Sequence, residues 1–360
     1  MTAPLKAPFP WFGGKSRAAE LIWSRLGVVR NYVEPFAGSL AVLLRNPNPP
    51  STETVNDLDC YLANFWRAIA SAPDDVAHWA DWPVNEADLH ARHQWLVNQS
   101  AFRERMKSDA DYYDARIAGW WVWGISCWIG AGWCKVTGRR PERRRPQASA
   151  GRTNGVFVRR QMPEVYWCGS KGVHQKIPSM HPKGNSGVHS SQLPRSDAQG
   201  DFGANADCNL TEWFSTLQVR LRRVRCICGD WQRVLTPTPL GLTDNVPVGF
   251  VTGVVLDPPY DGDLRDKDCY AIDGHKISAV VRDWAIAHGD SPRLRIALCG
   301  YEGEHDMPGA WKCVPWKAGG GYANQSAGGS LNSAKERIWF SPHCLRPERD
   351  ELPLYAEAIA

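Results

Sequence analysis

The stretch that decides the fold is VVLDPPYDG, Val254 to Gly262. Its first three residues are aliphatic or β-branched, and together with Gly253 they predict a buried strand. Pro258 and Pro259 cannot donate backbone hydrogen bonds, so the strand must end at Asp257. Each proline also keeps the residue before it out of the helical region, which gives a stiff, extended loop. Ligands of open α/β sheets bind at the carboxyl ends of strands, so this loop is predicted to be a site.

Size and composition set the class of protein. The chain has 360 residues, of which 43% are hydrophobic, enough for one large or two modest domains with real cores. A net charge of +4 is too small to identify a partner. We find no signal peptide and no apolar run long enough to span a bilayer, so we expect a cytoplasmic protein without a membrane partner.

The cysteines and histidines do not predict a metal site. Eleven cysteines are present without a CxxC pair, and the closest two are Cys226 and Cys228. On a strand these two thiols would share one face and could not readily bridge. We expect reduced, buried cysteines. His174, His181 and His189 are spaced too irregularly for zinc.

The first seventy residues and the last third of the chain alternate between helix and strand patterns. A helix is predicted over 18–27, with Gly27 as its cap, and a strand over 52–59 precedes a helix that starts at Cys60. The run LAVLLRN, residues 40–46, is expected to open a helix. A further helix begins near residue 210, with Thr211 as its cap.

The middle of the chain is different. After about Pro73 the segments 88–98 and 101–128 read as helical, and from Gly130 to about Asp207 the chain is rich in Gly, Ser, Arg, His and Pro. That stretch is too long for an ordinary loop, so it is either functional or disordered without a ligand. A middle segment therefore interrupts an α/β domain.

Two motifs precede this segment. In PWFGGKSR, residues 10–17, the double glycine that ends at Gly14 allows close approach to a ligand, Lys15 offers a charge and Trp11 a stacking face. In YVEPFAGSLAVLL, residues 32–44, a strand runs into a turn and an expected helix start, which is a nucleotide-binding arrangement. Because Gly38 is the one glycine in that turn, a dehydrogenase fingerprint is disfavoured.

Asp57 follows Glu34 by 23 residues and ends the next predicted strand. A carboxylate at that place can accept hydrogen bonds from ribose hydroxyls. The alternative, that Asp57 caps the helix beginning at Cys60, is almost equally well supported by this residue alone.

The motifs WFGGK, EPFAG and DPPY, in this order, resemble those of the Dam-like (alpha-ordered) family of N6-adenine DNA methyltransferases. The resemblance covers about residues 8–70 and 213–343. It implies an α/β fold: a Rossmann-like sheet that uses S-adenosylmethionine, with an inserted, mostly helical and irregular target-recognition domain. The implied division is a catalytic domain over 1–72 and 211–345, an insert over 73–210 and a tail over 346–360.

The chemistry of an exocyclic amine fits the DPPY loop. Such an amine is a poor nucleophile until acceptors pull on its N–H groups, and the Asp257 carboxylate and the Pro258 carbonyl are two acceptors on a rigid loop. Tyr260 can stack on a base that has left the duplex. The expected catalytic residues are Asp257, Pro258, Pro259 and Tyr260.

The resemblance also implies a cofactor site. Trp11, Lys15, Asp57 and Asp257 match positions that contact S-adenosylmethionine, and Gly14 lies beside them in the first motif. The same pocket would be lined by Glu34, Pro35, Phe36 and Gly38. One departure concerns the residues after EPFAG, where many relatives carry another Gly or Ala pair and this chain has Ser39 and Leu40. The methionine contacts therefore differ in detail.

A basic run lies in the middle segment. Residues 135–160 hold nine Lys or Arg residues and one acidic residue, Glu142. A solvated surface is the ordinary explanation, but in a methyltransferase insert phosphate contact is favoured. The DNA contacts expected here are Lys135, Arg139, Arg140, Arg143, Arg144 and Arg145. A second basic cluster comprises Arg220, Arg222, Arg223 and Arg225.

We therefore expect a site-specific enzyme that methylates adenine N6 of a flipped-out base in duplex DNA. N4-cytosine methylation, a DNA-binding regulator with an inactive cofactor pocket, and RNA as substrate remain as alternatives. The sequence leaves open the recognition sequence, a homodimeric state and an accompanying restriction enzyme.

Overall fold

A single mixed sheet forms the centre of the molecule. The computed structural model describes residues 5–9, 11, 14–109, 111–128, 133–134, 210–260, 277–316 and 335–347. Its strands lie in the order β3-β2-β1-β4-β5-β7-β6. The first five in that order run parallel, and β7 is antiparallel to both β5 and β6. The strands are β1 (Asn31–Glu34), β2 (Thr52–Asp57), β3 (Val224–Cys228), β4 (Thr252–Leu256), β5 (Leu294–Tyr301), β6 (Lys312–Pro315) and β7 (Glu336–Phe340).

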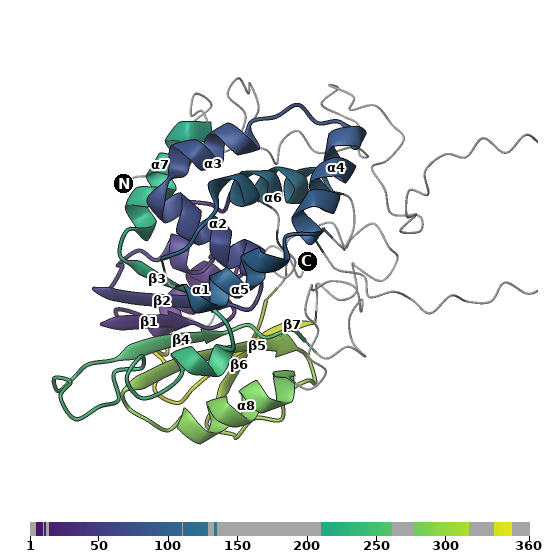
Figure 1. Cartoon of the computed structure of the whole chain (residues 1–360). Helices are drawn as coiled ribbons and strands as arrows, with labels where there is room; N and C mark the ends of the chain where they lie inside the picture. Colours follow the sequence, from purple (N-terminus) through teal and green to yellow (C-terminus); the bar gives the residue numbers. More distant parts are fainter. Residues whose placement is uncertain are drawn as a thin grey trace, which may run out of the picture.

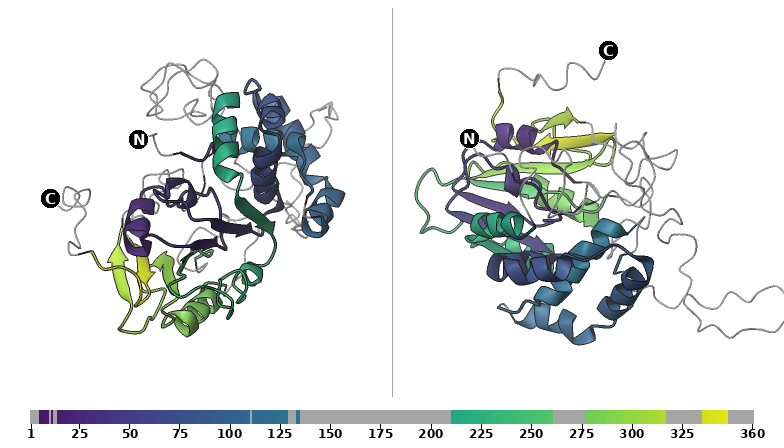
Figure 2. Two further views of the ribbon diagram at one scale, coloured as in Figure 1. Left: turned by 90° about the vertical axis from the view of Figure 1, so that its left-hand side faces the viewer. Right: turned by 90° about the horizontal axis from the view of Figure 1, so that it is seen from above.

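Helices cover both faces of this sheet, which confirms the expected α/β class. Figures 1 and 2 show a thick layer of helices on one side of the sheet, with α8 on the other side. The helices are α1 (Ala19–Leu26), α2 (Cys60–Ser71), α3 (Pro73–Ala80), α4 (Glu86–Val97), α5 (Ser100–Ser108), α6 (Ala115–Cys127), α7 (Leu210–Leu221) and α8 (Ile277–His288). None of the helices within the described ranges has the length and apolar character needed to cross a bilayer.

The alternation of side chains along the strands divides the core in two. Tyr32 of β1 belongs to the cluster beneath α2 and α6, whereas its neighbour Val33 packs with the residues under α8. In β4, Val255 faces the first cluster and Val254 the second. All four residues are fully or almost fully buried, as strands covered on both faces must be.

The strand order places a switch point between β1 and β4. Val33 pairs with Thr54 of β2 on one side and with Val254 of β4 on the other. The chain leaves β1 towards β2 and returns much later to β4, so the connections diverge at this point. A crevice opens at the carboxyl ends of two such strands, and this is where ligands bind in open α/β sheets. Glu34 ends β1, and Asp257 follows β4 directly.

Two local predictions are wrong. The helix expected at 40–46 is reduced to one 3-10 turn, η1 (Leu43–Arg45). Leu40 has φ 54°, a left-handed conformation that cannot start an α-helix, and Asn46 is extended before Pro47. Thr211 does not cap the helix near residue 210, because it lies inside α7.

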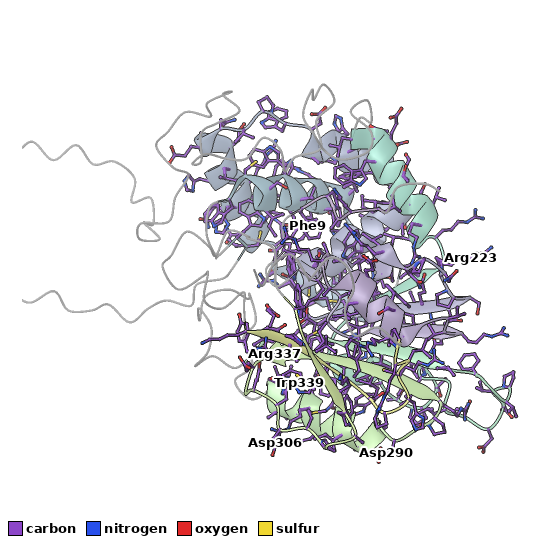
Figure 3. The ribbon with its side chains drawn as sticks, turned by 180° about the vertical axis from the view of Figure 1, so that it is seen from behind. Phe9, Arg223, Asp290, Asp306, Arg337 and Trp339 are labelled. Atoms are coloured by element: carbon purple, nitrogen blue, oxygen red, sulfur yellow. The ribbon has the colours of Figure 1, made fainter. Side chains whose placement is uncertain are left out.

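The helices that follow Pro73 share a core with the first part of the chain. The Phe9 ring lies 5.4 Å from Phe65 of α2 and 5.1 Å from Trp121 of α6, centroid to centroid. Phe9 occupies the middle of the molecule, between the helical layer and the sheet (Figure 3). Close helix crossing is possible because α6 carries Gly119, where a Cβ would come within 2.4 Å of the Trp79 Cβ atom. The boundaries proposed at 72 and 211 stay a prediction.

Candidate active site

A buried ion pair lies at the switch point. The Nζ atom of Lys15 is 2.9 Å from Oδ1 of Asp257. Lys15 reaches it from the loop before α1, and Asp257 is the first residue after β4. Lys15 is 3% exposed, so its charge needs compensation within the protein. The first and third sequence motifs therefore meet at one point.

Tyr260 ties this pair to a second carboxylate. Its hydroxyl donates to Oδ1 of Asp257 at 3.1 Å and is 2.9 Å from Oε2 of Glu336. The hydroxyl has one proton and two close acceptor oxygens, so it bridges them. The ring is buried, lies 4.6 Å from the Tyr301 ring in a T-shaped arrangement, and has Lys15 Nζ 5.1 Å from its centroid.

Glu336 is a site residue that the sequence analysis missed. It is 4% exposed, lies at the start of β7 and has its Oε2 atom 3.9 Å from Lys15 Nζ. Because β7 runs antiparallel, its first residue meets the edge where the parallel strands end. A carboxylate at the start of a strand is not an expected site signal unless the direction of that strand is known. The missing information was the direction of β7 in the sheet, which no sequence motif gives.

The charges in this cluster support one another. Burial opposes the charge of Lys15, but the nearby carboxylates of Asp257 and Glu336 outweigh it, so the pKa of the lysine is raised above its ordinary value. Burial raises the pKa of Glu336, while Lys15 partly offsets this. Lys15 therefore stays a cation that holds two carboxylates in place.

Glu34 ends β1, the strand next to β4. Its side chain is 4% exposed and accepts a hydrogen bond of 3.0 Å from the hydroxyl of Tyr32. Burial is the main cause that raises the pKa of Glu34 to about 8, and the negative charge of Asp257 adds to the shift. In the protein without ligands, Glu34 is thus largely protonated at neutral pH.

Asp57 organises the turn after β1. Its Oδ2 accepts from the Gly38 N–H at 3.0 Å, and its Oδ1 accepts from the Asp59 N–H at 2.9 Å. Burial raises the pKa of Asp57 to about 7, and the two backbone hydrogen bonds limit the shift. Asp59, whose side chain accepts from the Tyr61 N–H, is the N-cap of α2. The residue that caps α2 is therefore Asp59 and not Asp57.

Trp11 covers the same turn. Gly38 has φ 48°, and a Cβ there would come within 2.6 Å of the Trp11 Nε1 atom. The glycine is thus required both by its backbone conformation and by the indole above it. Gly14 lies next to Trp11, and its N–H donates to the Trp11 carbonyl at 3.3 Å.

The remaining predicted residues are divided between the crevice and its surroundings. Pro35 is buried, and its carbonyl accepts from the amide of Asn56 at 3.0 Å. Phe36, which is partly buried, stacks on Trp231 at 5.9 Å between ring centroids. Pro258 is buried and Pro259 partly buried in the extended loop.

The predicted DNA contacts cannot be placed, because Lys135 and the five arginines from Arg139 to Arg145 lie outside the described residues. Of the second basic cluster, Arg220 forms a two-pronged ion pair with Glu53 at 2.6 and 2.7 Å, so it holds α7 to β2. Arg222, Arg223 and Arg225 are exposed (Figure 3 labels Arg223). No cluster of metal-ligating side chains occurs in the part of the chain that the structure describes.

The edge as a whole is acidic and built around one lysine. Four carboxylates contribute to it, two of them with a pKa raised to about 7 or 8 by burial. Such a set suits a ligand that carries positive charge and hydroxyl groups, and Asp257 can accept hydrogen bonds from an amine. The four are Glu34, Asp57, Asp257 and Glu336.

Comparison with known proteins agrees with this chemistry. Residues 11–118 match the family model of the D12 class N6 adenine-specific DNA methyltransferases. The match contains Trp11, Lys15, Glu34 and Asp57, and it ends before the DPPY loop. A comparison with curated proteins gave no match. Enzymes of this class take their methyl group from S-adenosylmethionine and act on adenine in DNA. The Dam-like resemblance is thus confirmed over residues 11–118, the part of the chain that matches the D12 class of N6 adenine-specific DNA methyltransferases.

Proposed function

We propose that the cluster around Asp257 is the catalytic centre at which the adenine N6 amine is held. One observation supports this most directly. Among the described residues, both hydrogen bonds to Asp257 go to Oδ1, from Lys15 and from Tyr260, whereas Oδ2 accepts none. The carboxylate is therefore fixed through one oxygen and presents the other. Oδ2 accepts a hydrogen bond from one N–H group of the amine, and the Pro258 carbonyl beside it accepts one from the other N–H group.

Lys15, Tyr260 and Glu336 are positioning residues in this proposal. Lys15 fixes the position of Asp257 through the ion pair of 2.9 Å between Nζ and Oδ1. Glu336 holds the Tyr260 hydroxyl, and Tyr260 in turn holds Asp257. Stacking of the Tyr260 ring on the target base stays a prediction.

The side chains at the carboxyl edge of the sheet suit S-adenosylmethionine. That cofactor, when bound, supplies a methyl group activated by a sulfonium cation. The acidic edge suits its charge, the Asp57 carboxylate suits ribose hydroxyls, and the Phe36 ring, which stacks on Trp231, suits an adenine ring on its other face. Trp11, Gly14, Lys15, Glu34, Pro35 and Gly38 complete the proposed pocket.

We propose further that residues 73–210 form the target-recognition part and that its basic run contacts phosphates. Half or more of protein–DNA contacts go to the backbone, which positions a duplex without reading its sequence. The described helices α3 to α6 would support this run. The same proposal includes a homodimeric enzyme, a cognate restriction enzyme and a cytoplasmic location.

The test is a set of variants assayed on plasmid DNA, with modified positions identified by single-molecule sequencing. Asp257→Ala and Asp257→Asn should each lower turnover about 100-fold or more, because a positioned electrostatic partner of the reacting group is worth that much. Asp283→Ala, an exposed carboxylate on α8, is the matched control and should be unaffected.

Calorimetry should show that Asp57→Ala weakens S-adenosylmethionine binding, while Asp59→Ala lowers the melting temperature without this effect. Near-normal turnover of a folded Asp257 variant would overturn the assignment. Methylated cytosine would move the chemistry to N4.

A further inference from the structure

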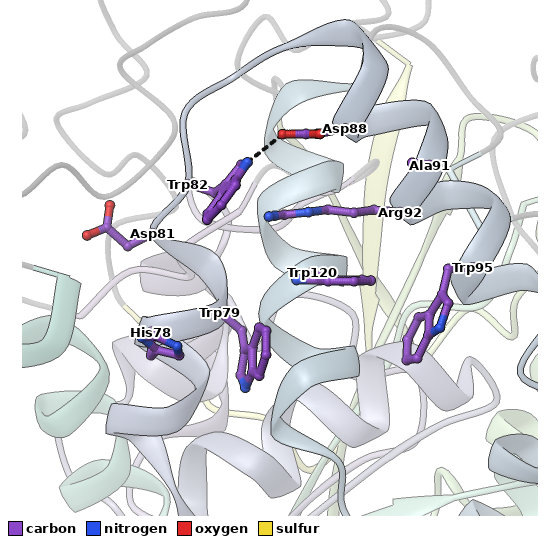
Figure 4. A pocket seen from close by; sticks show the side chains of 9 residues that line it. All are labelled: His78, Trp79, Asp81, Trp82, Asp88, Ala91, Arg92, Trp95 and Trp120. Atoms are coloured by element: carbon purple, nitrogen blue, oxygen red, sulfur yellow. Dashed lines mark hydrogen bonds between the residues drawn. The ribbon is translucent and has the colours of Figure 1, made fainter.

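A cavity lies in the helical layer, and none of the residues of the cluster around Asp257 lines it. It has a volume of about 540 Å³ and is formed by α3, α4, α6 and the loop between α3 and α4. Ligand pockets in proteins are typically about 300–1,000 Å³, so it is large enough for a nucleotide. Figure 4 shows the lining side chains, which are His78, Trp79, Asp81, Trp82, Asp88, Ala91, Arg92, Trp95 and Trp120.

Arg92 lines this cavity and lies among three tryptophan rings. Its guanidinium carbon lies 4.9 Å from the ring centroids of Trp82 and Trp120 and 4.4 Å from that of Trp123. Figure 4 shows the side chain between the Trp82 and Trp120 rings. Aromatic faces attract a cation, which offsets part of the cost of burying it. A planar guanidinium between planar rings also leaves its N–H groups at the edges of the stack.

The hydrogen bonds of Arg92 are incomplete. The residue is 7% exposed, and its Nη1 atom has no hydrogen-bond partner in the part of the chain that the structure describes. Asp88 does not supply one among the described residues: its Oδ2 atom accepts from the indole of Trp82 and from Asn85, each at 2.6 Å, and no hydrogen bond joins it to Arg92 Nη1. A buried donor without an acceptor is costly, so an incoming acceptor is favoured here.

An exposed charge and a half-exposed ring lie at or next to the lining. Arg116 does not line the cavity itself, but it is exposed and lies over two lining rings, Trp120 at 4.2 Å and Trp95 at 4.7 Å. Trp82 is 49% exposed. A ligand that fits these features is flat and aromatic, carries acceptor atoms on its edge, and is joined to an anionic group.

We propose that this cavity binds a nucleobase that has left the stack of the DNA, with Trp82 and Arg92 as its stacking platform and donor. Base–aromatic stacking is tolerant of sequence and contributes about 1–3 kcal/mol per base. The phosphate of the same nucleotide meets Arg116 next to the lining. The proposal rests on DNA being the substrate, but it assigns a site separate from Asp257.

The location of α6 gives the cavity a connection to the active site. Trp121, adjacent to Trp120 on this helix, has its ring 6.4 Å from the Trp11 ring, which covers Gly38. The two sites therefore lie on different faces of one helix. A base held in the cavity on one face of α6 therefore fixes the position of the duplex relative to the proposed active site on the other face.

Trp82→Ala tests the proposal with little risk to folding. The residue is half-exposed, and its backbone carbonyl, which accepts from the Trp123 indole at 2.8 Å, remains in the variant. The measurement is fluorescence anisotropy with two labelled duplexes, one fully paired and one with a single unpaired cytosine. Wild type should bind the second more tightly by about 5-fold or more, the equivalent of stacking one base.

The preference should disappear in Trp82→Ala, persist largely in Trp82→Phe, and weaken in Arg92→Lys, which keeps the charge and loses the planar group. Trp284→Ala, which removes a partly exposed tryptophan from α8, is the matched control. The preference should also survive in Asp257→Ala, which separates this cavity from the catalytic centre.

A wild-type enzyme without the preference, or a Trp82→Ala variant that keeps it, overturns the inference while leaving methyl transfer untouched. Loss of the preference in Asp257→Ala would assign it to the catalytic centre instead.

Discussion

Glu336 is the residue whose role is most specific to this structure. Glu336→Gln keeps the size of the side chain and an oxygen for Tyr260, but removes the charge that Lys15 and Tyr260 face. Hydrogen bonds to charged groups contribute about 1.5–3 kcal/mol, so kcat should fall about ten-fold or more, with a smaller change in KM for S-adenosylmethionine. Steady-state kinetics measures both.

Glu302→Gln is the matched control for this experiment. Glu302 also pairs with a cation, Arg337, at 2.8 Å, but its side chain is 64% exposed, and exposed ion pairs contribute little. A Glu336→Gln enzyme with unchanged kcat would show that the Tyr260 hydroxyl does not depend on this carboxylate.

The raised pKa of the buried Glu34 leads to a prediction of how the free energy of unfolding depends on pH. Its pKa is about 8 in the folded protein and near 4.5 when unfolded, so between these values the folded state holds a proton that the unfolded state has lost. The free energy of unfolding therefore decreases as pH rises through this window. Glu34→Gln cannot titrate, so its unfolding energy should fall less steeply, by up to about 1.4 kcal/mol per pH unit.

Denaturant unfolding of the protein without cofactor, at pH 5, 6, 7 and 8, measures this difference. Asp57, with a pKa raised to about 7, contributes in the same direction and remains in the variant. Parallel pH dependences in wild type and Glu34→Gln would contradict the assignment.

Among the elements, the turn between β1 and β2 contains a backbone conflict. Leu40 is fully buried yet has φ 54°, which costs a non-glycine residue about 1–2 kcal/mol. Glycine normally destabilises a protein relative to alanine by about 0.5–1 kcal/mol. At this position the order should reverse, so Leu40→Gly should be as stable as Leu40→Ala or more stable, by up to about 1 kcal/mol.

Both substitutions should destabilise relative to wild type, by about 2–5 kcal/mol for the lost leucine side chain. The same pair at Leu43, which is equally buried but in the η1 turn, is the control and should show the ordinary order. Chemical denaturation gives all four values.

The strand ends were the most predictable elements. The prolines after Asp257 and the acidic ends of β1 and β2 placed Glu34, Asp57 and Asp257 correctly, because chain-breaking residues act locally. The left-handed Leu40 could not be predicted, since tertiary burial of its side chain overrides local preference. Nor could Glu336, whose place depends on the direction of a strand.

At the scale of the whole molecule, the two groups of arginines should behave differently. If the run at 139–145 contacts phosphates, neutralising Arg139, Arg143 and Arg145 should flatten the plot of log affinity against log salt by about 0.9 for each contact. Matched and mismatched duplexes should weaken alike, with the methylated sequence unchanged. Binding titrations at several salt concentrations measure the slope.

Arg220→Gln is the informative comparison, because Arg220 is paired with Glu53 inside the fold. It should lower stability and leave the salt slope unchanged. An unaltered slope in the triple variant would make the run a solvated surface, and an altered recognition sequence would mean that these arginines read bases.

The cluster around Asp257 joins residues from opposite parts of the chain. Lys15 and Glu336 are in the same ion-pair network, although almost the entire polypeptide lies between them. Contacts so distant in sequence form late in folding, because a long loop must close first. During synthesis, Lys15 and Asp257 can leave the ribosome and still lack the strand that completes their surroundings. The cluster around Asp257 is thus complete only when β7 docks, so a nascent chain that already holds Lys15 and Asp257 still lacks the Glu336 carboxylate.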